Sequence, residues 1–182
     1  MPFKRSRKVY DEQMLYEYAI GALGRKMRTT AELKRLMREK VREQPHAELL
    51  VDVVVARLKE QRYLNDTAYA ESYSRFRKDN EKFGRMRVVQ DLKAKGVHGD
   101  IIEKTVSAAY GDVNEEQLAR QFLQRKRLKQ PSDQKQAARI FRTMVRAGFS
   151  SRIIFRILKQ WNVDEETLSA LESEPAEAEP ER

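Results

Sequence analysis

The residue types that could do catalytic chemistry in this 182-residue chain are two histidines and many carboxylates. His46 and His98 each stand at or near an expected helix start, without a partner at the spacing of a zinc ligand set, so we expect capping or solvent exposure for both. Cysteine is absent, which excludes disulfides, thiolate metal ligands and cysteine nucleophiles. Glycine-rich phosphate loops are absent too. The sequence therefore predicts no enzyme active site, no metal site and no cofactor.

The carboxylates stand beside basic residues at helical spacing, as Glu32 does with Arg35, and this mixing is typical of a solvated face with weak ion pairs. What remains is positive charge. The chain has a net charge of +9, and its last eleven residues hold five glutamates and one arginine, so residues 1–171 carry +13. A region this basic is expected to bind a polyanion or an acidic protein surface. The alternative is a surface that only confers solubility.

The basic residues gather in three clusters, each on the first two helices of an expected repeat and on the loop between them. The candidate partner-binding residues are Lys34, Arg35 and Arg38 in the first cluster, Arg75, Arg77, Lys78, Lys82, Arg85, Arg87 and Lys93 in the central cluster, and Arg125, Lys126 and Arg142 in the third. Further cations of the third cluster are Arg120, Arg127, Lys129, Lys135, Arg139 and Arg146. We expect Arg75, Arg77, Arg85 and Arg87 to be the main anchors.

Aromatic residues interleave with the central cluster: Tyr63, Tyr69, Tyr73, Phe76 and Phe83. Side chains of this kind can stack on nucleobases. Their helical spacing favours core packing instead, with Tyr73 and Phe83 the least firmly placed.

The elements that must position these residues read as helices with clear end signals. Asp11 can cap the first, Thr29 and Glu32 form a capping box for the second, and Asn65 or Asp66 can cap the fourth. Pro45 ends the second helix. The third helix is expected to bury a stripe of Leu49, Leu50, Val53, Val54 and Leu58.

An internal repeat links the later helices. Shifting Val88–Val106 forward by 52 positions aligns Leu92 with Met144, Gly96 with Gly148, and Val97 with Phe149. Gly96 is expected to adopt a left-handed conformation at a helix end, with Val97 packing back on that helix. The expected fold is all-α, with three tandem three-helix repeats in an elongated, curved array.

The expected boundaries are a basic disordered arm at 1–10, repeats at 11–64, 65–111 and 112–162, and a short helix with an acidic disordered tail at 163–182. No run of 18 apolar residues occurs, and the N-terminus lacks a signal-peptide pattern. We expect a soluble cytoplasmic protein that does not bind membranes.

The sequence resembles the bacterial RecX family across roughly residues 10–162. The resemblance depends on fixed spacings among Tyr63, Leu64, Asp66, Tyr69, Ala70, Tyr73, Gly84, Leu92, Gly96, Val97, Gly148 and Phe149. Asn65 stands where the family often has an acidic residue. The resemblance implies a tandem three-helix protein, expected as a monomer, that binds the RecA filament on DNA. It also implies inhibition of RecA ATP hydrolysis, filament growth and strand exchange, and thus a role in DNA repair, recombination and the SOS response. Weaker electrostatic binding to single- and double-stranded DNA is implied as well.

Two other functions fit the charge. A stand-alone DNA-binding protein could use its three-helix units as helix-turn-helix modules, with affinity falling steeply as salt rises. An RNA-binding or ribosome-associated protein is allowed by the charge, although no motif supports it.

Overall fold

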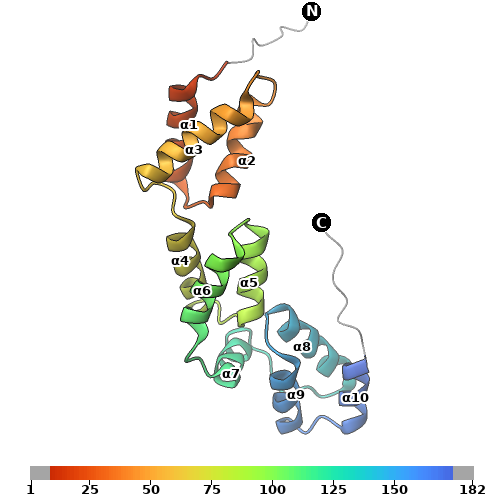
Figure 1. Cartoon of the computed structure of the whole chain (residues 1–182). Coiled ribbons are helices and arrows are strands. Elements are labelled where there is room, and N and C mark those ends of the chain that lie inside the picture. The colour runs from red at the N-terminus through yellow and green to blue at the C-terminus, as the bar shows by residue number, and fades with distance from the viewer. Residues whose placement is uncertain (1–8, 174–182) are drawn as a thin grey trace, which may run out of the picture. The chain divides into compact units, whose positions relative to one another are not determined.

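The computed structural model describes residues 9–173, and every regular element in that range is an α-helix (Figure 1). The helices are α1 (Glu12–Arg25), α2 (Thr30–Val41), α3 (Ala47–Glu60), α4 (Asp66–Asp79), α5 (Arg85–Ala94), α6 (Gly99–Tyr110), α7 (Glu115–Arg125), α8 (Gln134–Arg146), α9 (Ser151–Gln160) and α10 (Glu165–Ser173). The predicted all-α class is confirmed for these residues. Most of the expected basic arm and the end of the acidic tail lie outside the described range.

The chain divides into two compact units. The first comprises Met1–Ser72 and Leu92–Thr105, and the second comprises Tyr73–Asp91 and Val106–Arg182. Each of α4, α5 and α6 therefore contributes residues to both units. The boundaries of the three expected repeats stay a prediction.

The core of the first unit lies between α1, α2 and α3, which pack on one another (Figure 1). Its buried members are Leu15, Ala19, Ala22, Leu33, Met37, Val41, Val51, Val54, Val55, Leu58 and Leu64. Fully burying one leucine or methionine is worth roughly 1.5–3 kcal/mol, which offsets the entropy lost when the helices become ordered. Tyr10 belongs to this unit rather than to a free arm, because its amide donates to Gln44 Oε1 at 2.7 Å.

Helix starts in the first unit follow the predicted caps. Thr29 Oγ1 accepts a hydrogen bond from the Glu32 amide at 3.1 Å, and Glu32 Oε2 accepts one from the Thr29 amide at 3.2 Å. Asn65 Oδ1 caps α4 by accepting from the Ala68 amide at 2.9 Å. Asp66 caps a different helix: its Oδ1 accepts from the Thr30 amide at 2.8 Å, at the start of α2.

The predicted buried stripe of α3 is partly wrong. Leu49 and Val53 are 64% and 41% exposed, whereas Val51 and Val55 are buried beside Val54. The apolar run from Leu49 to Val55 is almost continuous, so periodicity leaves more than one helix rotation open. Packing against α1 and α2 selects the rotation that buries the valines.

The core of the second unit joins α7, α8 and α9, and α10 packs on α8 (Figure 1). Its buried residues include Leu118, Phe122 and Leu123 on α7, Ile140, Phe141 and Met144 on α8, and Ile153, Ile154, Ile157 and Leu158 on α9. On each helix these residues recur at helical spacing. Phe122 is at the centre of an aromatic group, with its ring centroid 6.0 Å from that of Phe83 and 5.5 Å from that of Phe149.

Two of the predicted core aromatics are instead at the surface. Tyr63 is 58% and Phe76 53% exposed, while Tyr69 is buried. Tyr63 comes three residues after the end of α3, and there the next residue, Leu64, enters the core in its place. On α4 the small residues Ala70 and Ser74 define the buried side, so Phe76 falls outside it.

Left-handed residues end several helices, and glycine is used where space demands it. Gly96 follows α5 with φ +73°, and Gly148 follows α8 with φ +87°. A Cβ at Gly96 would stand 2.4 Å from the Ala31 Cβ, and one at Gly148 would stand 2.2 Å from the Arg87 amide nitrogen. The two glycines therefore allow a helix-ending turn to pack against the first turn of another helix, α2 in the first unit and α5 in the second.

The residue after each glycine makes the predicted contact with the helix that has just ended. The Val97 amide donates to the Leu92 carbonyl at 3.1 Å, the Phe149 amide donates to the Met144 carbonyl at 3.2 Å, and both side chains are buried. These bonds complete Schellman turns, which satisfy carbonyls that the helix leaves without partners. The correspondence of Gly96 with Gly148 in the 52-residue repeat is thus also a structural one.

Candidate partner-binding surface

Arg77, one of the expected anchors, is half-buried in the second unit and has several internal partners. Its Nη2 lies 2.7 Å from Asp91 Oδ2, and its Nε donates to Tyr73 Oη at 2.9 Å. The guanidinium centre lies 5.1 Å from the Tyr73 ring centroid and 4.8 Å from that of Phe83. Burial has the largest single effect and opposes the charged guanidinium, but the hydrogen bonds to Asp91 and Tyr73 and the electrostatic attraction of both groups together outweigh it and raise the pKa of Arg77.

Arg87 binds the same carboxylate, with Nε at 3.0 Å from Asp91 Oδ1 as an ion pair that is not aligned for a hydrogen bond. Tyr73 Oη also donates to Asp91 Oδ2, at 2.9 Å. Burial raises the pKa of Tyr73, and the neighbouring carboxylate raises it further. Asp91 therefore joins α4 to α5, and Arg77 and Arg87 are committed to this internal network.

Two further cations of the central cluster contact α6. Lys78 Nζ donates to the Ala109 carbonyl at 3.0 Å, near the C-terminal end of α6, where a positive charge complements the helix dipole. Arg85 Nη2 donates to Ser107 Oγ at 3.1 Å and is exposed. Lys78 thus serves packing, whereas Arg85 has a neutral partner and keeps its charge uncompensated.

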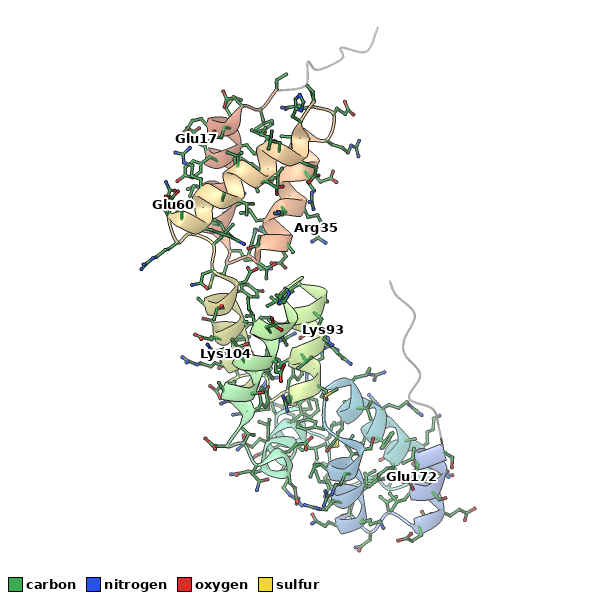
Figure 2. All side chains as sticks on the ribbon, in the orientation of Figure 1. Glu17, Arg35, Glu60, Lys93, Lys104 and Glu172 are labelled. Carbon is green, nitrogen blue, oxygen red and sulfur yellow. The ribbon has the colours of Figure 1, made fainter. Side chains whose placement is uncertain are left out.

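Four of the candidate residues have no hydrogen-bonding or charged side-chain partner among the described residues. Arg75 is exposed on α4, and Lys82 stands in a left-handed conformation with φ +59° in the loop after it. Figure 2 labels the other two in the first unit, Arg35 on α2 and Lys93 on α5, and both are exposed. These four cations, together with Arg85, are central- and first-cluster candidates whose charge is left for a partner.

The remaining first-unit candidates pair with α3. Lys34 Nζ lies 2.7 Å from Asp52 Oδ1, and Arg38 makes a bidentate contact with Glu48, with a shortest distance of 2.8 Å. The hydrogen bond to Arg38 lowers the pKa of Glu48, and that to Lys34 lowers the pKa of Asp52. These exposed pairs hold α2 and α3 in register and leave less charge for a partner.

In the third cluster, Arg125 lies 3.5 Å from Glu81, and Lys126 lies over the Phe122 ring at 5.9 Å. Arg142 is exposed on α8 and belongs to a row of four cations. The members of this α8 row are Lys135, Arg139, Arg142 and Arg146, all exposed.

The α8 row has a simple helical basis. Steps of four, three and four residues place the side chains on one face over about 16 Å, at 1.5 Å per residue. No acidic residue occurs in α8, and Lys135 and Arg139 make no ion pair within the part of the chain that the structure describes. The opposite face buries Ile140 and Met144. The row was detectable from the spacing in the sequence, although only Arg142 is among the candidate residues.

Most residues of the family motif have structural roles. Leu64, Tyr69, Ala70, Leu92, Val97 and Phe149 are buried, and Gly84 is buried where a Cβ would meet the Gly148 carbonyl oxygen at 2.2 Å. Tyr73 and Asp66 make the hydrogen bonds described above, and Tyr63 is exposed. The motif therefore defines the packing rather than a reactive site.

Within residues 9–173, no group of three or more histidine or acidic side chains is placed to hold a metal ion. His46 occupies the N-cap position of α3 without capping it through its side chain, and His98 lies 3.5 Å from Asp100 at the surface. Over the same residues, the helices are too short or too polar to cross a membrane.

Comparisons with known proteins agree with this architecture. Residues 65–106 match the family model described as RecX, second three-helix domain. The chain is 33% identical to the regulatory protein RecX of Deinococcus radiodurans, in an alignment that covers 87% of this chain and 74% of the relative. It is 28% identical to the regulatory protein RecX of Bacillus velezensis over 93% of this chain, and it spans 63% of that relative's length.

The fold is also that of a solved structure. The crystal structure of RecX from Lactobacillus salivarius superposes with a TM-score of 0.60 and 23% identity, covering 83% of this chain and 96% of that one. Three findings agree: the fold is all-helical in the described residues, the three-helix domain model matches, and one relative is aligned over most of its length. The chain belongs to the RecX family of regulatory proteins.

Proposed function

We propose that this protein is a non-catalytic regulator that binds the RecA filament on DNA and restrains it, slowing ATP hydrolysis, filament growth and strand exchange. Family membership supports the regulatory role. The α8 row is the observation that supports the mode of binding, because four cations on one helix face without an acidic residue suit a strip of carboxylates or phosphates. A filament groove offers both kinds of anion along a regular path.

Further cations outside the α8 row extend this proposal. Arg35, Lys93, Arg75, Lys82 and Arg85 would each add a weak contact, and several weak contacts made together raise the apparent affinity strongly. Arg77 and Arg87 would act indirectly, by holding α4 and α5 in position. The protein would act as a cytoplasmic monomer that needs no cofactor, with direct DNA binding weaker than filament binding.

The test is a charge reversal on the α8 row. The variant Lys135→Glu/Arg139→Glu should raise the concentration needed for half-maximal inhibition of RecA ATP hydrolysis on single-stranded DNA by about tenfold, from two lost contacts of about 0.5–1 kcal/mol each. The matched control is Lys59→Glu/Lys104→Glu, which reverses two exposed cations on α3 and α6 and should stay within about twofold. Equal losses in both variants, or no loss in the first, would refute the assignment.

The stand-alone DNA-binding alternative has support from the same row, because phosphates suit an unbroken line of cations. It predicts tight binding to duplex DNA without RecA, with log affinity falling by roughly 0.9 per phosphate contact for each tenfold rise in salt. A salt titration on naked duplex, run beside the ATPase assay, distinguishes the two functions.

A further inference from the structure

The second unit contains a hollow of about 440 Å³ where α7 ends and where the chain leaves α9. Its volume is in the range of small-ligand and side-chain binding sites. The lining residues are Arg120, Leu123, Gln124, Arg127, Leu128, Lys129 and Trp161. Apolar walls and a basic rim thus occur together in one place.

Some of the cations at the rim of the hollow have no partner within the described residues. Arg120 is engaged, with Nη2 2.9 Å from Glu116 Oε1 and in contact with the Gln160 side-chain oxygen. Arg127 and Lys129 make no hydrogen bond or ion pair through their side chains among residues 9–173. Two positive charges therefore border the apolar walls without a partner in the chain.

The backbone at Arg127, where α7 has ended, is in the left-handed region. Arg127 has φ +54° and forms a Schellman turn, in which its amide donates to Gln124 and the Leu128 amide donates to Leu123 at 2.9 Å. A residue other than glycine costs about 1–2 kcal/mol in this conformation. Gly96 and Gly148 occupy the same position after α5 and α8. Arg62 and Asn162 adopt the same conformation after α3 and α9, but at Arg127 the turn places this arginine and the following Leu128 in the lining of the hollow.

We propose that the hollow binds a short acidic segment of a protein partner. One apolar side chain of that segment lies among Leu123, Leu128 and Trp161, and its carboxylates pair with Arg127 and Lys129. This site is separate from the α8 row and goes beyond the proposed function, because it supplies a second, side-chain-specific contact.

The lining favours a peptide over single-stranded nucleic acid. Strand-binding sites place successive bases on several aromatic rings, whereas this hollow has one ring and two leucines, which match an aliphatic or single aromatic side chain.

Trp161 is the only tryptophan of the chain, so its fluorescence reports on this hollow directly. The probe is a blocked hexapeptide with one leucine among five aspartates, and the control peptide has serine in place of the leucine. The leucine peptide should shift Trp161 emission to shorter wavelength in a saturable way, and the serine peptide should bind at least about fivefold more weakly because it buries no apolar side chain.

Two glycine variants test the role of Arg127 without unfolding the protein. Arg127→Gly suits the left-handed backbone and should weaken the leucine peptide roughly fivefold, as expected for one ion pair. Arg62→Gly, at the left-handed position after α3, removes the same charge from the same backbone conformation outside the hollow and should change the affinity less than twofold.

Three results would overturn the proposal. They are an unchanged Trp161 spectrum with the leucine peptide, equal effects of Arg127→Gly and Arg62→Gly, and a saturable shift with a six-nucleotide oligothymidylate that the peptide does not produce. The last would assign the hollow to nucleic acid. Reversing Lys135 and Arg139 should leave peptide binding intact, so failure here is distinguishable from failure of the filament proposal.

Discussion

Replacing Gly96 by alanine should destabilise the first unit far more than an ordinary surface substitution. The left-handed backbone with φ +73° costs a Cβ-bearing residue about 1–2 kcal/mol. The new methyl would stand 2.4 Å from the Ala31 Cβ, where two carbons need about 3.5–4 Å. Overpacking of this kind typically costs about 1–3 kcal/mol more.

If the start of α2 and the turn at Gly96 move apart to relieve this clash, a neighbouring hydrogen bond is stretched. Thr29 Oγ1 donates to the Lys95 carbonyl at 2.6 Å, and such a bond contributes about 1 kcal/mol net. Gly96→Ala should therefore lower the free energy of unfolding by about 3–6 kcal/mol. Urea denaturation followed by circular dichroism measures this change.

A double-mutant cycle separates the strain from the clash. Ala31→Gly alone should cost about 0.5–1 kcal/mol, and in the Gly96→Ala background it should instead recover about 1–3 kcal/mol, because it removes the atom in the way. Gly24→Ala is the matched control, since nothing lies within 4 Å of its Cβ position, and it should stabilise α1 by about 0.5–1 kcal/mol. A coupling energy below about 0.5 kcal/mol would refute the steric argument.

Three further outcomes are expected. Arg77→Leu should lower the free energy of unfolding by about 2 kcal/mol. This loss is smaller than that for breaking a fully buried ion pair, because Arg77 and its partner Asp91 are both partly exposed. Burial tends to raise the pKa of Glu32, but Lys95 and the Thr29 amide lower it on balance. The ionised Glu32 carboxylate therefore stabilises the fold above a pH of about 4.3, and this stability is lost as the pH falls through the folded-state pKa. Glu32→Gln should flatten this acid dependence in thermal melts recorded at different pH values. Arg62→Gly should raise the unfolding midpoint in urea by relieving left-handed strain worth about 1 kcal/mol.

Each of these outcomes has a control in the chain. Arg75→Leu removes an arginine from the same helix as Arg77 and should change stability by less than about 0.5 kcal/mol, because Arg75 is exposed and makes no ion pair within the described residues. Glu103→Gln, on the exposed side of α6, should leave the acid dependence as it is. Arg62→Ala should bring no gain, because alanine keeps the Cβ that causes the strain.

The helix ends were predictable because they depend on residues close together in the sequence. Thr29 with Glu32, and Gly96 with Val97, each form their bonds within three to five residues, and the sequence shows both partners at once. Asp66 is different. The sequence suggested that Asp66 could cap its own helix, α4. Its partner is instead the Thr30 amide, 36 residues earlier, which no local pattern indicates.

The sequence predicted which residues carry the positive charge of the candidate surface, but not which of them are left without partners inside the protein. Arg77 and Asp91 are 14 residues apart on different helices, and their pairing depends on how α4 and α5 pack. A count of cations therefore cannot separate Arg77, which is used internally, from Arg75, which is not. The face of α3 was likewise undetermined, because valines and leucines adjoin along it and only its neighbours select which of them are buried.

The hydrogen bond between Thr29 and Lys95 has a consequence for synthesis on the ribosome. The three-helix core forms from the first seventy residues, but the Lys95 carbonyl, which accepts from Thr29 at the start of α2, lies 66 residues later in the chain. In a nascent chain the Thr29 hydroxyl therefore lacks this acceptor until the turn at Gly96 has emerged, although the capping box with Glu32 can already form. Stalling or cleavage between residues 73 and 95 would release a fragment that has its apolar centre and lacks its closing contact.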